Sequence, residues 1–179
     1  MNLPNKLTVL RVCMVPVFVV LMLMESLGDA GKYAAAVVFI LASATDWLDG
    51  YLARKNNLVT DFGKFMDPIA DKLLVCSAMI CLVEKGLLPA WIVIVIIGRE
   101  FIISGFRLVA SDKGVVIAAS YWGKFKTVSQ MIMVILLILD LGGVFSTLAQ
   151  IFTWIALILT VVSLADYLKK NWGVMDGEM

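Results

Sequence analysis

The sequence predicts an all-α integral membrane protein, built as a bundle of six transmembrane helices. Hydrophobic residues make up 61% of the 179-residue chain and charged residues only 16%, which is far more apolar than a soluble domain. The apolar segments also reach the length of about 20 residues that a helix needs to cross a bilayer. Because these segments take up nearly the whole sequence, we expect residues 1–179 to form a single transmembrane domain.

The six predicted helices are separated by glycines and charged residues. They span residues 8–24, 33–54, 65–83, 89–109, 121–139 and 147–168, with breaks predicted at Gly28, Gly31, Gly86, Gly114, Gly142 and Gly143. The first segment has basic residues at its start, as a secretory signal does. No A-x-A cleavage site follows it, so we expect a retained anchor.

The basic residues predict that both termini lie in the cytoplasm. This orientation leaves only Lys32 and Lys85 outside the cell and follows the positive-inside rule. The cytoplasmic residues are then Lys6, Arg54, Lys55, Lys64, Lys113, Lys124, Lys126, Lys169 and Lys170. The connection between the second and third segments is also placed at the cytoplasmic leaflet.

Acidic residues lie in or against the apolar segments, where a charge near the bilayer centre costs about 3 kcal/mol on insertion scales. They are Asp46, Asp49, Asp67 and Asp71. The chain contains no histidine, so oxygens are the available ligands, and they suit hard cations such as Mg²⁺ or Mn²⁺. The positive charge of two such ions per site balances the negative charge of four carboxylates, and the ions can position a phosphate between them. A purely structural pairing with Arg54, Lys64 and Lys72 is the alternative.

Helical spacing places these acidic residues on two helix faces. The first face carries Asp46, Asp49, Gly50 and Ala53, and the second carries Gly63, Asp67 and Asp71. The small residues leave a groove beside the carboxylates, because residues three and four positions apart are neighbours on a helix. A short connection makes the two helices antiparallel neighbours, so we expect both faces to share one site.

The same region resembles the CDP-alcohol phosphatidyltransferase family. It reproduces the signature D-x2-D-G-x2-A-R-x8-G-x3-D-x3-D at Asp46, Asp49, Gly50, Ala53, Arg54, Gly63, Asp67 and Asp71. The six-segment layout extends the resemblance to nearly the whole chain. The resemblance implies a homodimeric membrane enzyme that uses Mg²⁺ or Mn²⁺ to transfer a phosphatidyl group from CDP-diacylglycerol to an alcohol, with release of CMP.

The resemblance also implies a role for each signature residue. The four aspartates hold metal, and Asp71 also acts as general base on the acceptor hydroxyl. The CDP group is bound by Asp46, Asp49, Gly50, Ala53, Arg54 and Gly63. The residue chemistry agrees with these roles, because in a chain without histidine an aspartate remains as the base for a metal-assisted in-line displacement.

The opening segment LPNKLTVLR and the short chain resemble the bacterial branch of this family, whose acceptor is sn-glycerol 3-phosphate. Within that segment Asn5, Thr8 and Arg11 lie about one helical turn apart. They either line the cytoplasmic mouth of the site, with Thr8 at the CDP group, or form a capped helix start from which Arg11 snorkels. Inositol phosphate, serine and phosphatidylglycerol are the alternative acceptors that the signature allows.

A phosphorylated acceptor requires a basic pocket, for which the fourth and fifth segments offer Arg99, Arg107, Lys124 and Lys126. The two arginines lie two helical turns apart on one face of an apolar segment, and guanidinium groups bind phosphate by charge-assisted hydrogen bonds. The two lysines fit ordinary positive-inside flanking charge equally well. Glu100 is a candidate partner for one of the arginines.

A divalent-cation transporter is the alternative from another functional class. Transporters commonly hold their ions near the bilayer midplane between repeated halves, whereas here the acids gather on the cytoplasmic side and no repeat is visible. We therefore expect a phospholipid-synthesising enzyme of the bacterial cell membrane, with its active site facing the cytoplasm. Its expected partners are CDP-diacylglycerol, glycerol 3-phosphate, membrane lipids and a second copy of the chain, without nucleic acid.

Overall fold

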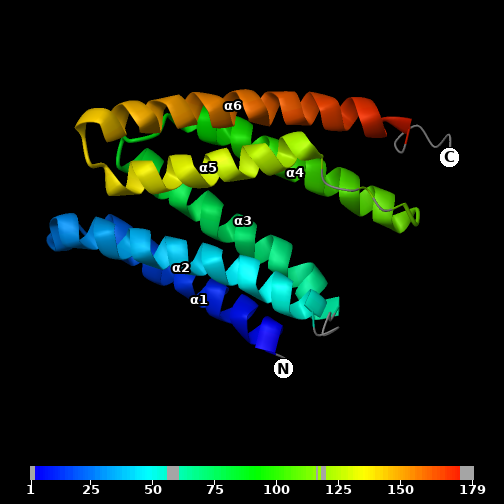
Figure 1. Ribbon diagram of the computed structural model, residues 1–179, viewed down its shortest axis with the longest axis horizontal. Coiled ribbons are helices and arrows are strands. Elements are labelled where there is room, and N and C mark those ends of the chain that lie inside the picture. The colour runs from blue at the N-terminus through cyan, green and yellow to red at the C-terminus, as the bar shows by residue number, and fades with distance from the viewer. Residues whose placement is uncertain (1–2, 56–60, 116, 118–119, 174–179) are drawn as a thin grey trace. The chain divides into compact units, whose positions relative to one another are not determined.

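The computed structural model describes the backbone of residues 3–55, 61–115, 117 and 120–173, and the side chains of the same residues apart from 3–4 and 46–65. Over these residues the protein is helical, without strands (Figure 1). The helices are α1 (Leu3–Leu23), α2 (Gly28–Lys55), α3 (Asp61–Glu84), α4 (Ala90–Asp112), α5 (Tyr121–Leu139) and α6 (Gly143–Asn171), with a short 3₁₀ helix, η1 (Glu25–Leu27), before α2.

Each predicted helical segment coincides with one of these helices, and α5 has the predicted limits. Helices α1, α2, α3 and α6 begin earlier than predicted, because polar residues such as Asn5 and Lys6 extend a helix beyond its apolar run. The predicted breaks at Gly28, Gly86, Gly114, Gly142 and Gly143 are confirmed by positive φ angles. The break predicted at Gly31 is wrong, since this residue lies inside α2.

In the part of the chain that the structure describes, four segments are long and apolar enough to cross a membrane. They are Asn5–Leu23, Glu25–Thr45, Tyr121–Leu139 and Gly143–Asn171. Helix α4 has 23 residues but contains Arg99, Glu100 and Arg107, so charge rather than length distinguishes it from these segments. The structure therefore supports a helical membrane protein, and the six-span arrangement is considered below.

The first of two compact units contains α1, α2, α3 and residues 137–140. Helix α1 packs against both α2 and α3, and the rings of Phe18 and Phe39 lie 5.9 Å apart in the α1–α2 contact. Gly31 explains part of this close packing: a Cβ atom there would lie 2.8 Å from the carbonyl oxygen of Leu21 and 2.9 Å from the Cβ of Leu27. Hydrogen in place of a side chain at position 31 thus lets α2 approach the end of α1.

The second unit contains α4, most of α5, and α6. Helices α4 and α6 pack along each other. Aromatic pairs mark the two ends of this contact: the rings of Trp91 and Trp154 lie 6.3 Å apart, and Phe106 meets Tyr167 edge to face at 6.3 Å. Between these pairs, Ile96 and Ala156 are fully buried. The packed helices α4 and α6 carry charged residues of this unit, among them Arg99 and Glu100 on α4.

We predict that Gly31→Ala destabilises the protein. The added methyl group meets a backbone oxygen that cannot move away cheaply, and such overpacking typically costs about 1–3 kcal/mol. Thermal unfolding in detergent should show a lower midpoint. Gly105→Ala is the matched control, because a Cβ there meets nothing within 4 Å and alanine favours the helix. Equal midpoints for the two variants would show that Gly31 is not a packing requirement.

Candidate active site

The acidic signature residues lie on helices, as the spacing predicts. Helix α2 continues through Lys55 and α3 begins at Asp61, so the signature positions described here have helical backbone. Asp67 and Asp71 are half-buried one turn apart on α3. The other signature residues, Asp46, Asp49, Gly50, Ala53, Arg54 and Gly63, lie outside the described side chains.

Helix α1 supplies a buried polar face to this unit. The Thr8 hydroxyl donates a hydrogen bond to Oδ1 of Asp67 at 2.5 Å, and the Nε group of Arg11 donates to the carbonyl oxygen of Ala42 in α2 at 3.2 Å. Asn5, one turn before Thr8, is also buried. Arg11 is 0% exposed, so the interpretation in which this side chain snorkels to solvent is wrong. The polar start of α1 instead contacts α2 and α3 from within the unit.

The Thr8 contact defines the orientation of a predicted metal ligand. A hydroxyl that donates to one carboxylate oxygen limits the rotation of that carboxylate, so Asp67 is held toward α1. Asp67 and Asp71 offer the all-oxygen donors that Mg²⁺ and Mn²⁺ prefer. Among the described side chains no group of three or more acidic, histidine or cysteine residues gathers. Asp46 and Asp49 lie outside these described side chains. The described pair fits one half of the predicted ligand set.

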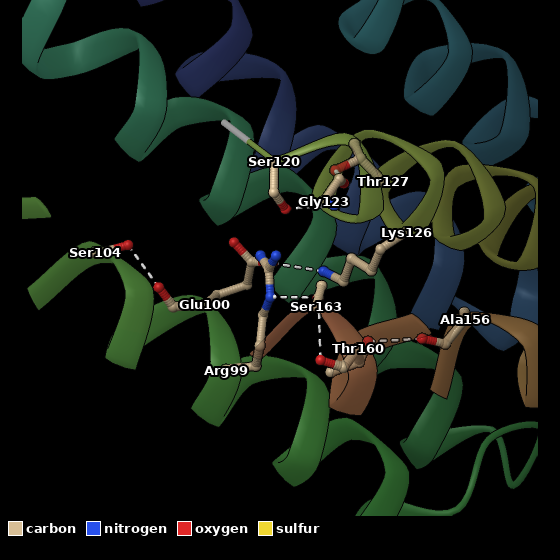
Figure 2. Close-up of polar contacts among 10 residues, drawn as sticks. All are labelled: Arg99, Glu100, Ser104, Ser120, Gly123, Lys126, Thr127, Ala156, Thr160 and Ser163. Atoms are coloured by element: carbon tan, nitrogen blue, oxygen red, sulfur yellow. Dashed lines mark hydrogen bonds and ion pairs between the residues drawn. The ribbon is translucent and has the colours of Figure 1, made fainter. Parts of the chain in front are cut away.

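In the second unit, Arg99, Glu100 and Lys126 converge on one point (Figure 2). The Nη1 group of Arg99 lies 2.9 Å from Oε1 of Glu100, and Nζ of Lys126 lies 2.5 Å from the same oxygen. Arg99 is 8% exposed and Lys126 is 2% exposed. Glu100 thus pairs with an arginine, as the sequence suggested. Two buried cations therefore share one carboxylate oxygen.

The guanidinium group of Arg99 is fixed from two further sides. Its Nε group donates to Oγ of Ser163 in α6 at 3.2 Å, and that hydroxyl donates to the carbonyl oxygen of Thr160 at 3.1 Å (Figure 2). A Cβ atom at Gly123 would lie 3.3 Å from Nη2 of Arg99, so this glycine lets α5 approach closely. The sequence analysis missed Ser163 and Gly123, because neither belongs to a recognisable motif.

The other two basic residues lie apart from this cluster. The guanidinium carbon of Arg107 lies 6.0 Å from the ring centre of Tyr167, in a cation–π contact at an exposed position. Lys124 is exposed, with its Nζ atom 5.3 Å from the ring centre of Tyr121. The structure therefore brings Arg99 and Lys126 together, whereas Arg107 lies two turns further along α4 and Lys124 is exposed.

Comparison with known proteins points to one family. The model of the CDP-alcohol phosphatidyltransferase family matches residues 1–162. A CDP-diacylglycerol–glycerol-3-phosphate 3-phosphatidyltransferase of Bacillus subtilis is 48% identical, over 96% of this chain and 95% of the relative. Proteins of the same name from Rickettsia typhi and Haemophilus influenzae are 40% and 39% identical, over 94% and 96% of this chain and 96% and 94% of theirs.

We predict that Glu100→Gln strongly destabilises the second unit. The substitution removes the carboxylate that two buried cations share, and breaking a buried ion pair from one side typically costs about 3 kcal/mol or more. The midpoint of thermal unfolding in detergent should fall accordingly. Glu84→Gln, at an exposed position, is the control and should leave the midpoint unchanged. A Glu100→Gln midpoint equal to that control would contradict the buried pairing.

Proposed function

Because the chain belongs to the CDP-alcohol phosphatidyltransferase family, we propose that it transfers the phosphatidyl group of CDP-diacylglycerol to sn-glycerol 3-phosphate. The products are phosphatidylglycerophosphate and CMP. Relatives that are 39–48% identical over nearly the full chain carry the name of this activity. The structural observation that carries the proposal is the meeting of two buried cationic side chains, Arg99 and Lys126, at one glutamate, because guanidinium and ammonium groups bind phosphate by charge-assisted hydrogen bonds.

The acceptor phosphate is bound, in this proposal, by residues of the second unit. The proposed residues are Arg99, Arg107, Lys124 and Lys126, of which Arg99 and Lys126 meet at Glu100 whereas Arg107 and Lys124 are exposed. A positive charge within an apolar helix is stabilised by a neutralising partner, and a phosphate oxygen accepts charge-assisted hydrogen bonds from guanidinium groups. Serine, with no phosphate, does not offer this neutralisation. The buried pair of Arg99 and Lys126 therefore favours a phosphorylated acceptor over serine.

The first unit binds the CDP group and the reacting phosphate. The proposed CDP-binding residues are Thr8, Asp46, Asp49, Gly50, Ala53, Arg54 and Gly63. The proposed ligands of two Mg²⁺ or Mn²⁺ ions are Asp46, Asp49, Asp67 and Asp71. When bound, these ions supply neutralisation of the diphosphate and of the charge that develops on the leaving CMP. Thr8 contributes by holding the Asp67 carboxylate in a fixed orientation.

Asp71 serves as the general base of the proposed reaction. Its carboxylate takes the proton of the acceptor hydroxyl, while the hydroxyl oxygen forms a bond to the phosphatidyl phosphorus. The bond between that phosphorus and the CMP oxygen breaks in line with the attack, and CMP leaves with the bonding electrons. Asp71 lies one turn after Asp67 on α3, which places base and metal ligand on the same helix face.

The proposed membrane arrangement has six spans with both termini in the cytoplasm. The six helices of the described residues support the number of spans, and the distribution of lysine and arginine supports the orientation. The active site then faces the cytoplasm of a bacterial cell, where a water-soluble acceptor is available. A homodimer, which the family resemblance implies, completes the proposal. Family membership leaves the cation-transporter alternative without specific support.

We predict that the protein with added Mg²⁺ or Mn²⁺ transfers labelled phosphatidyl groups to glycerol 3-phosphate. A panel with inositol phosphate, serine and phosphatidylglycerol should give little product. Asp71→Asn should lower the rate about a thousandfold, equivalent to about 4 kcal/mol of transition-state stabilisation, and excess EDTA should abolish transfer. Preferred transfer to another alcohol would overturn the acceptor assignment, and substantial turnover in EDTA would overturn the metal-dependent reaction.

We also predict that Arg107→Lys weakens use of the acceptor. Lysine keeps the charge but cannot make the two parallel hydrogen bonds that a guanidinium group makes to phosphate. The acceptor KM should rise, or its kcat/KM fall, while CDP-diacylglycerol binding measured without acceptor stays near wild type. Wild-type acceptor kinetics, or a loss confined to CDP-diacylglycerol binding, would remove Arg107 from the acceptor site.

A further inference from the structure

A surface cavity of about 260 Å³ lies in the first unit, away from the acidic signature. Its lining comes from the end of α1, from η1, from the start of α2, and from the residues that follow α3 and α5. All of these segments belong to one compact unit. Along α2 the distance from Asp29 in the lining to Asp46 in the signature is about 25 Å. The cavity is therefore separate from the proposed active site.

Three candidate membrane spans have an end at this cavity. The span Asn5–Leu23 ends and the span Glu25–Thr45 begins beside it, and the span Tyr121–Leu139 ends one residue before Asp140 of the lining. The ends of a membrane span lie where the hydrocarbon core of the bilayer meets the lipid headgroups. These three ends place the cavity at the depth of the headgroups.

Charged side chains of both signs line the cavity. They are the carboxylates of Glu25, Asp29 and Asp140 and the ammonium groups of Lys32 and Lys85. Asp29 and Lys32 form an ion pair of 2.9 Å, so the formal charges of these two residues balance. Within the part of the chain that the structure describes, the other three form no ion pair. Two carboxylates and one ammonium group thus remain for a ligand.

This mixture of charges indicates a ligand that itself carries both signs. A simple anion would face the carboxylates, and a simple organic cation would face the lysines. The lining does not suit a metal ion, because no three acidic, histidine or cysteine residues gather to hold one among the described side chains. The lining also has an apolar part, Met22, Leu87 and Ile138, which suits the uncharged part of an amphiphile.

We propose that the cavity binds the headgroup of a zwitterionic phospholipid with a primary ammonium group, such as phosphatidylethanolamine. The ammonium group donates to the carboxylates of Glu25 and Asp140, and the phosphate accepts from Nζ of Lys85. The surrounding bilayer supplies this ligand at the depth where the cavity lies. The inference goes beyond the proposed function, because this lipid takes no part in the transfer reaction.

The test is native mass spectrometry of the full chain in detergent with equimolar phosphatidylethanolamine and phosphatidylcholine of the same acyl chains. The two headgroups carry the same charges, but the trimethylammonium group of phosphatidylcholine has no N–H group to donate. Wild-type protein should bind about threefold more phosphatidylethanolamine, as expected for exposed charged groups. The double variant Glu25→Gln, Asp140→Asn should lose this preference. Asparagine suits position 140, where φ is 41°.

Two further variants serve as comparisons. Glu84→Gln is the matched control, because Glu84 is an exposed carboxylate beside Lys85 in the sequence but does not line the cavity. It should keep the wild-type preference. Lys85→Gln should weaken binding of both lipids equally, because both carry the phosphate. Lipids bound elsewhere on the apolar surface contribute equally to all variants, so differences between variants report on the cavity.

Three outcomes would overturn the assignment. The first is a wild-type protein without the preference, or a double variant that keeps it. The second is stronger binding of phosphatidylglycerol, an anionic lipid, than of phosphatidylethanolamine. The third is displacement of the lipid by water-soluble glycerophosphoethanolamine, which would assign the cavity to a soluble compound with the same headgroup chemistry. If the double variant does not fold, as judged by thermal unfolding, Asp140→Asn alone decides by the same comparison.

Discussion

The need to neutralise charge inside apolar helices determines the local structure of both units. A carboxylate or a guanidinium group that lies among hydrophobic side chains requires an oppositely charged or hydrogen-bonding partner nearby. Glu100 meets this need for Arg99 and Lys126 in the second unit, and the backbone of α2 meets it for Arg11 in the first. The same need explains a neighbouring glycine, since Gly123 makes room for the side chain of Arg99.

The two chemical tasks of the proposed reaction are divided between the two units. The first unit carries the acidic signature, which suits a nucleotide diphosphate and its metal ions. The second carries the buried cations Arg99 and Lys126, which in the proposed function bind a phosphorylated acceptor. In the proposed function the donor chemistry belongs to α2 and α3, and the acceptor chemistry to α4 and α5.

The helices, and the placement of Asp67 and Asp71 one turn apart on α3, could be predicted from the sequence, because apolar runs, glycine breaks and residues four apart are local signals. Contacts between distant helices could not. Thr8 and Asp67 are 59 residues apart, and Arg99 and Ser163 are 64 residues apart, so no periodicity links them. Lys124 and Lys126 look equivalent in sequence, yet only Lys126 is buried, because residues two apart point to opposite sides of a helix. Gly31 was misread because close helix packing also selects glycine.

The hydrogen bond between Thr8 and Asp67 also has a consequence for biogenesis. During synthesis α1 emerges first, and α2 brings the Ala42 carbonyl to Arg11 across a separation of 31 residues. The Thr8 hydroxyl receives its carboxylate only after α3 has followed. The polar face of α1 is therefore satisfied stepwise, in the order of translation. An insertion intermediate that stops after α2 therefore still lacks the hydrogen bond between Thr8 and Asp67.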